Sequence, residues 1–144
     1  MSATSTQATD RKDRARILLV DDMPENIDVL GMLLNEYQRS VALDGDKALD
    51  IAFSDFPPDL ILLDILMPGM DGYEVCRLLK EHPKTKDIPV IFITSLNEVE
   101  DETKGFELGA VDFITKPFSS SVVKARVRTH LALKKAREEL LAQN

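Results

Sequence analysis

The sequence predicts an α/β protein in which a parallel sheet is covered by helices on both faces. Short apolar runs alternate with amphipathic stretches along most of the chain, which is the order expected of β-α units. The apolar runs are continuous, which indicates strands buried on both faces. With 144 residues, of which 44% are hydrophobic and 30% charged, the chain is long enough for one well-cored domain and too short for two ordinary ones.

Five strands are predicted. The first, third and fourth are the most apolar, whereas the second is weaker and therefore suits an edge of the sheet. In chain order the strands cover residues 16–21, 39–44, 59–64, 88–94 and 110–116.

Each strand is followed by an amphipathic stretch that predicts a helix. Pro24 suits the first turn of the first helix, because its missing N–H is not needed there. The last helix is longer than a compact domain of this size needs. The predicted helices cover residues 24–37, 45–55, 72–82, 97–109 and 119–144.

Composition narrows the classes of function. The net charge of −7 argues against a nucleic-acid-binding surface. No apolar run is long enough to cross a membrane, and the N-terminus has no signal-peptide core, so a cytoplasmic protein is expected. The single cysteine, Cys76, lies on an apolar helix face and is predicted to be a buried structural thiol. The polar, Ser/Thr-rich residues 1–15 are expected to be a disordered leader.

Polar side chains gather where the strands end. The carboxyl ends of parallel strands lie along one edge of a sheet, and ligands bind there. Four segments therefore bring carboxylates, hydroxyls and an ammonium to that edge, from Asp21, Asp22, Asp64, Thr94, Ser95 and Lys116.

This set of groups favours metal-assisted phosphoryl transfer. Clustered carboxylates repel one another, and Mg²⁺ offsets that repulsion with oxygen ligands while keeping some of its waters. The Asp64 carboxylate could attack phosphorus and form an acyl phosphate. Lys116, the Thr94 hydroxyl and the Ser95 backbone N–H would bind the phosphoryl oxygens.

Each of these signals also has a simpler interpretation. Asp22 could be the N-cap of the first helix, and Asp71–Gly72 could be only a turn and helix start. Lys116–Pro117 could be only a loop, and Thr94 an ordinary strand residue. Their joint placement at one edge favours the functional interpretation.

The sequence resembles the receiver domains of two-component response regulators, including those of the bacterial chemotaxis type. The matching segments are "LLVDDMPEN", "LLDILMPGMDG", "IFITS" and "GAVDFITKPF", in the family's order and spacing. The match covers residues 16–130, with residues 131–144 as a helical extension or a linker to an output module.

The resemblance implies a flavodoxin-like, doubly wound sheet of order 2-1-3-4-5 and an aspartyl phosphate formed on Asp64. It implies that Asp22, Asp64 and the backbone carbonyl of Leu66 bind Mg²⁺ directly, with Asp21 assisting through water. Mn²⁺ could take the place of Mg²⁺. The donor would be a histidine kinase or phosphotransfer protein of a phosphorelay, and the Lys116–Pro117 bond would be cis.

The resemblance also implies a switch. Thr94 would move towards the phosphoryl group, and Phe113, where the family often has Tyr, would change rotamer. The readout face would be the fourth helix, fifth strand and fifth helix of the family's fold, here from residue 98 onward. The last helix places Leu133, Ala136 and Leu140 at heptad spacing, which suggests a homodimer on phosphorylation or a connector to an output domain outside this chain.

Two other classes of function fit less well. An aspartate-based phosphatase or transferase would want a second acid two residues after Asp64, where this chain has Leu66. A flavin- or nucleotide-binding domain would need a Gly-rich loop after the first strand, where "DDMPEN" would repel a phosphate. The sequence thus predicts a signalling domain whose only catalysis is its own phosphorylation and dephosphorylation.

Overall fold

The structure of the chain is a computed structural model that describes residues 14–95 and 99–143. Residues 1–13 of the predicted leader lie outside the described residues, as do residues 96–98.

The sheet confirms the predicted fold class and strand order. All its strands are parallel, in the order β2-β1-β3-β4-β5. The chain places β2 on one side of β1 and the later strands on the other side, so the strand order reverses between β1 and β3. The weakest predicted strand is indeed at an edge. The strands are β1 (Arg16–Val20), β2 (Gln38–Ala42), β3 (Leu60–Asp64), β4 (Val90–Thr94) and β5 (Asp112–Thr115).

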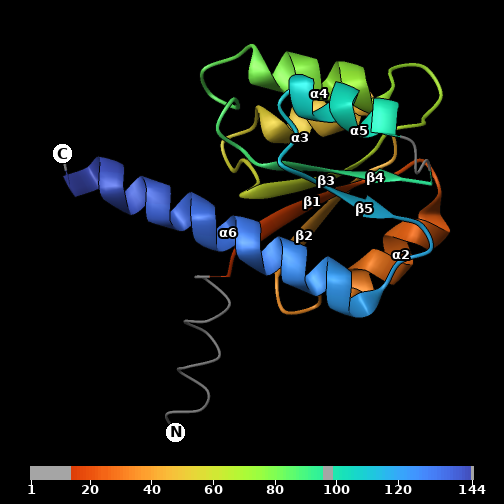
Figure 1. Cartoon of the computed structure of the whole chain (residues 1–144), viewed down its shortest axis with the longest axis horizontal. Coiled ribbons are helices and arrows are strands. Elements are labelled where there is room, and N and C mark those ends of the chain that lie inside the picture. The colour runs from red at the N-terminus through yellow and green to blue at the C-terminus, as the bar shows by residue number, and fades with distance from the viewer. Residues whose placement is uncertain (1–13, 96–98, 144) are drawn as a thin grey trace, which may run out of the picture.

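Helices cover both faces of the sheet. Figure 1 shows α3, α4 and α5 on one face and α2 and α6 on the other. The helices are α2 (Pro24–Leu33), α3 (Gly45–Ala52), α4 (Gly72–Lys80), α5 (Val99–Glu107) and α6 (Ser120–Gln143).

The core consists of two layers because successive strand side chains point to opposite faces. In β1, Leu18 and Val20 pack in the layer under α3 and α4, whereas Ile17 and Leu19 pack in the layer under α2 and α6. Every residue of β3 and β4 is buried, which explains their unbroken apolarity.

The first helix is shorter than predicted. It was expected to reach residue 37, but α2 ends at Leu33. Leu34 is fully buried and its N–H bonds the Leu30 carbonyl; the Tyr37 N–H then bonds the Leu34 carbonyl in a turn. The chain enters β2 at Gln38, whose N–H bonds the Ala15 carbonyl. Pairing with the sheet thus ends a helical pattern that the sequence alone extends further.

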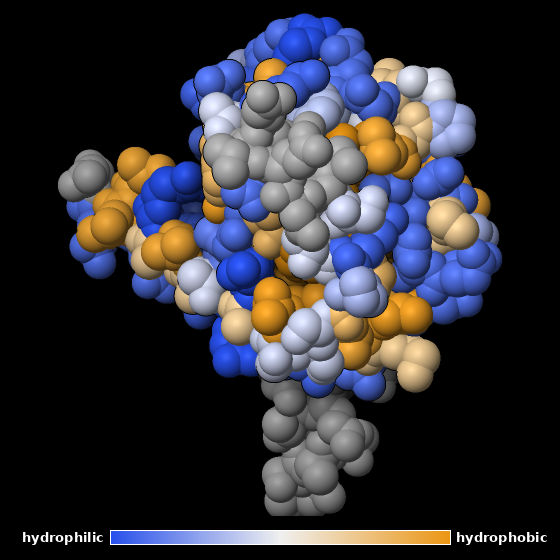
Figure 2. All heavy atoms as spheres, turned by 45° about the vertical axis from the view of Figure 1, so that its right-hand side comes forward, coloured by the Kyte–Doolittle hydropathy of each residue, from blue (hydrophilic) through white to orange (hydrophobic). Residues whose placement is uncertain are grey.

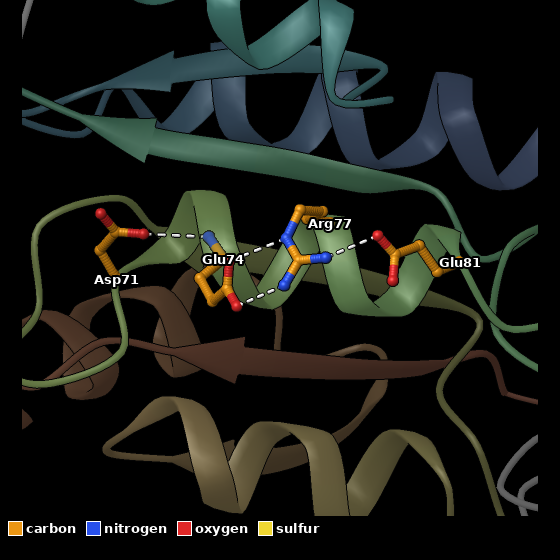
Figure 3. A network of polar contacts seen from close by, with 4 residues as sticks. All are labelled: Asp71, Glu74, Arg77 and Glu81. Atoms are coloured by element: carbon orange, nitrogen blue, oxygen red, sulfur yellow. Dashed lines mark hydrogen bonds and ion pairs between the residues drawn. The ribbon is translucent and has the colours of Figure 1, made fainter.

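Helix α4 begins and is braced through its own side chains. Asp71 is its N-cap and accepts a hydrogen bond from the Glu74 N–H, so the helix-start interpretation of Asp71 is confirmed. On the exposed face Arg77 bridges Glu74 and Glu81 (Figure 3). On the inner face Cys76 is buried, and this burial raises the pKa of its thiol to about 11, as expected of a structural cysteine.

The C-terminal half of α6 projects past the sheet (Figure 1). Val123 and Val127 anchor the helix in the core, whereas Leu133, Leu140 and Leu141 are 59%, 64% and 67% exposed. Among the described residues, no helix is both long enough and apolar enough to span a membrane.

Gly72 should be required for the close approach of α4 to the end of β3. A Cβ there would lie 2.3 Å from the Asp64 carbonyl oxygen and 2.8 Å from Ile65 Cα, both backbone atoms. Gly72→Ala should lower the free energy of unfolding in urea by about 1–3 kcal/mol. The matched control is Gly31→Ala, because Gly31 lies inside α2 and the nearest atom to its added Cβ is 3.6 Å away. That change should leave stability equal or raise it by up to about 1 kcal/mol. Equal losses in both variants would contradict this account.

Candidate functional site

The structure brings the three predicted carboxylates together at the carboxyl edge of the sheet. The β1–β3 register pairs Val20 with Leu63, so Asp21 lies beside Asp64 one residue further along. Asp21, Asp22 and Asp64 each offer a carboxylate oxygen, and these oxygens lie within 4.8 Å of one another. The cluster lies where the chain reverses across the sheet, the usual ligand position in this kind of fold.

Asp21 is fully buried and holds the turn that leads into α2. Its carboxylate accepts hydrogen bonds from the Met23 N–H at 2.9 Å and from Asn26 Nδ2 at 3.1 Å. The N-cap of α2 is Met23, not Asp22, so the alternative role of Asp22 as an N-cap is wrong. Asp22 is only partly buried, and its carboxylate belongs to the acidic cluster.

The charge of the cluster is only partly balanced. Lys116 Nζ lies 3.3 Å from Asp21 Oδ2 and 3.5 Å from Asp64 Oδ1. Burial, together with the negative charges of Asp21 and Asp22, raises the pKa of Asp64 from 3.8 to about 6, although Lys116 acts in the opposite direction. One ammonium therefore faces three carboxylates, and the site has a surplus of negative charge.

A hard divalent cation fits this arrangement. The donors are all oxygens, as Mg²⁺ prefers, and the surplus negative charge is what such a cation would offset. Leu66 follows β3 in the loop at the same edge and is 60% exposed.

The remaining predicted residues lie at, or directly after, the carboxyl ends of β4 and β5. Thr94 ends β4, is buried, and pairs with Thr115 of β5. Ser95 follows it and is exposed. The Lys116 N–H bonds the Thr94 carbonyl at 2.9 Å, and the Lys116–Pro117 peptide bond is cis. The edge thus carries an acidic cluster, an adjacent ammonium and two hydroxyl residues.

Comparison with known proteins assigns the family. The family model of the response regulator receiver domain matches residues 17–128. This chain belongs to the response regulator receiver family.

The curated relatives of this receiver domain are larger proteins. It is 50% identical over 129 residues to a protein of Vibrio cholerae named a probable cyclic di-GMP phosphodiesterase. It is 48% identical over 128 residues to the response regulator PleD of Caulobacter vibrioides. The matches cover 89% and 88% of this chain but only 29% and 28% of those relatives. The chain therefore spans less than a third of their length.

Solved structures agree on the fold. A putative response regulator from Chloroflexus aurantiacus is 33% identical, with a TM-score of 0.79 over 83% of this chain and 99% of that one. NtrX from Brucella abortus is 27% identical, with a TM-score of 0.83 over 91% of this chain and 30% of that one.

In the receiver domain, the predicted switch aromatic Phe113 is buried. Its ring packs against Phe92 and Phe106, with ring centroids 5.8 and 5.0 Å away. Gly105 makes room for it, because a Cβ at Gly105 would lie 2.4 Å from Phe113 Cζ.

Sequence reasoning missed a polar link between β5 and α6. Asp112, next to Phe113, lies 2.9 Å from His130 Nε2 and 3.7 Å from Arg126 Nε. Arg126 and His130 lie one turn apart on α6 and carry no motif that points to Asp112, so only the packing of α6 on the sheet reveals the link. Asn26 was also missed, although its place in "DDMPEN" next to the acidic pair is a usable signal.

The raised pKa of Asp64 predicts a specific pH dependence of stability in the metal-free protein. A carboxyl group with a folded-state pKa near 6 and an ordinary value of 3.8 binds its proton more tightly when folded. Its contribution to stability is therefore lost as the pH rises from about 4 to about 6. In EDTA we compare the free energy of unfolding of Asp64→Asn with that of the parent. The advantage of Asp64→Asn should be about 1–3 kcal/mol larger at pH 7 than at pH 4.

Urea unfolding of both proteins at several pH values measures this difference. Asp55→Asn is the control, because Asp55 is an exposed carboxylate outside the cluster. Adding Mg²⁺ should narrow the difference at pH 7, since the cation binds only the folded parent well. If the stability difference between the parent and Asp64→Asn stays the same at every pH, the raised pKa of Asp64 is wrong.

Proposed function

We propose that this receiver domain accepts a phosphoryl group on Asp64 from a phosphohistidine of a partner histidine kinase or phosphotransfer protein. The observation that carries the proposal is the cluster of Asp21, Asp22 and Asp64 with Lys116 beside it. A buried, rigid carboxylate next to a surplus of acidic ligands and one ammonium suits acceptance of a phosphoryl group better than proton transfer.

In the proposed reaction an Asp64 oxygen forms a bond to phosphorus while the phosphorus–nitrogen bond of the donor breaks. The electron pair of that bond stays with the imidazole, which becomes protonated from solvent. The product is an acyl phosphate on Asp64. Lys116 would bind a phosphoryl oxygen as a point charge, and the Thr94 hydroxyl and Ser95 N–H would bind others.

The proposal includes Mg²⁺, for which Mn²⁺ can substitute. Asp22, Asp64 and the Leu66 carbonyl would be direct ligands, and Asp21, which already accepts two hydrogen bonds, would act through water. When bound, the metal supplies charge neutralisation for the phosphoryl oxygens. The domain's only catalysis would be its own phosphorylation and dephosphorylation.

The proposed output is a change at the α5-β5-α6 face. Thr94 would shift towards the phosphoryl group, and Phe113 would leave or re-enter its buried position. Asp112 connects this strand to Arg126 and His130 of α6. A shift of β5 would therefore change the contacts that hold the helix. Residues 16–130 would form the receiver unit, and residues 131–144 a helical connector to an output module in a cytoplasmic protein.

The direct test of this function is incubation with acetyl phosphate and Mg²⁺, followed by mass spectrometry. The parent should gain one phosphoryl group, located on Asp64, and gain none in EDTA. Asp64→Asn should gain none, and Asp22→Asn should bind Mg²⁺ about tenfold or more weakly in calorimetry, because it loses a charged ligand. Asp55→Asn, which removes a charge elsewhere, should behave like the parent. Stable labelling of Asp64→Asn at another residue would refute the assignment.

Phosphorylation should also promote self-association through α6. The projecting end of α6 mixes apolar and polar residues on its surface (Figure 2), and Leu140 is 64% exposed. Beryllofluoride, a mimic of the phosphoryl group, should convert the monomer to a dimer in sedimentation runs at about 100 μM protein.

The neighbouring leucines offer a matched pair for this experiment. Leu140→Lys changes the heptad series of Leu133, Ala136 and Leu140 and should weaken the dimer. Leu141→Lys changes an equally exposed residue outside that series and should not. A monomer with and without beryllofluoride would leave α6 as a plain linker.

A further inference from the structure

A cavity lies at the opposite end of the sheet from the acidic cluster. It has a volume of about 400 Å³ and lies where the N-terminal ends of β4 and β5 meet the C-terminal half of α6. Pro89 and Val111, which precede these strands, line it together with Leu133. The five residues of β4 separate it from the acidic edge by about 15 Å.

The cavity is basic although the protein is acidic. Its wall contains Lys80, Lys86, Lys134 and Arg137 but only one acidic residue, Asp87. Lys134 faces two carboxylates, Asp59 at 3.6 Å and Glu138 at 2.7 Å, so this group of three has a net charge of −1. The other three cations carry a charge of +3, against −1 from Asp87 and −1 from the Lys134 group, so the cavity keeps a net positive charge within a chain whose net charge is −7.

Two of these cations are held in place by neutral partners. Lys80 Nζ donates to the carbonyl oxygens of Lys86 at 2.9 Å and Ile88 at 2.7 Å. Arg137 Nη2 donates to the Asp87 carbonyl oxygen at 2.9 Å. Carbonyl groups orient a cation without cancelling its charge. Within the described residues, neither Lys80 nor Arg137 lies in ion-pair contact with a carboxylate.

One of the three cations, Lys80, is partly buried, whereas Lys86 and Arg137 are exposed. Burial lowers the pKa of Lys80; Cys76 and Asp87 act in the opposite direction, and Arg137 adds a smaller lowering. The stem of Lys80 lies against Gly109, so its position is set by packing. The partly buried Lys80 and the exposed Arg137 repel one another across the cavity, and a bound anion would offset that repulsion.

We propose that this cavity binds a small phosphate-bearing anion. Phosphate oxygens match an arginine fork and two lysine ammonium groups, and the volume is within the range of small-ligand sites. Pro89, Val111 and Leu133 offer an apolar wall to an organic group attached to the phosphate. The proposal does not depend on phosphorylation of Asp64.

Such a ligand would join the domain to the helical extension. Lys80 and Lys86 belong to α4 and the loop after it, whereas Leu133, Lys134 and Arg137 belong to α6. An anion between them would hold the C-terminal half of α6 against the domain. Hydrogen exchange over residues 131–143 should therefore slow when the site is filled.

The test is a titration of the isotope-labelled full chain with pyrophosphate and, separately, with adenosine diphosphate. Working in EDTA keeps the acidic edge unfavourable to anions. Saturable shifts of the Val111 and Leu133 amide signals are expected, with a dissociation constant below about 1 mM. If the nucleotide binds more tightly than pyrophosphate, the apolar wall contributes to binding. If the two bind equally, recognition of the phosphate groups is sufficient. Both results agree with the proposal.

Two double variants separate this site from general charge effects. Lys86→Gln with Arg137→Gln should weaken binding about tenfold or more, since it removes two of the three uncancelled cations. Lys47→Gln with Lys135→Gln removes the same charge from exposed positions outside the cavity and should change little. Equal weakening in both pairs, shifts confined to Lys116 and its neighbours, or no binding of either probe at 10-fold the expected constant, about 10 mM, would overturn the proposal.

Discussion

The crowding of negative charge at the ends of β1 and β3 is the constraint on which the rest of the structure depends. Asp21 and Asp64 are almost completely buried, and the only ammonium within ion-pair distance among the described residues is that of Lys116. Like charges in such a place would move apart if the backbone allowed it. The backbone does not, because β1 and β3 lie inside the sheet with a paired strand on either side. The apolar core thus holds these carboxylates together at an electrostatic cost that a bound divalent cation would offset.

The residues around the acidic cluster also hold the neighbouring turns and helix in place. Asp21 satisfies the Met23 N–H and Asn26, so its carboxylate also serves the turn into α2. Gly72 lets α4 start directly against the Asp64 carbonyl, and its N–H bonds the Ile65 carbonyl at 2.8 Å. Asp21 and Gly72 therefore stabilise the fold as well as shaping the acidic cluster. Substitutions at either residue should change both the stability of the protein and the geometry of the cluster.

Most of the fold and the acidic site could be predicted from sequence because both depend on local patterns. Unbroken apolar runs such as Leu60–Leu63 are typical of central parallel strands, and polar residues at their ends must meet at one edge. The end of α2 could not be predicted, because a buried Leu34 and the start of β2 override an intact helical pattern. The Asp112–His130 contact and the basic cavity could not be predicted either. Both form only when α6 packs back against the sheet, and the direction of that packing is not encoded in a local pattern.

Strand β5 is the physical connection between the two ends of the molecule. At its carboxyl end Lys116 faces the acidic cluster, and at its amino end Asp112 contacts α6 beside the basic cavity. Phe113 lies between them in the core. If a phosphoryl group at Asp64 and an anion in the basic cavity both change how α6 rests on β5, their binding free energies must be coupled, and equally in both directions. An anion that holds α6 against the domain would then oppose any phosphorylation-driven release of the helix.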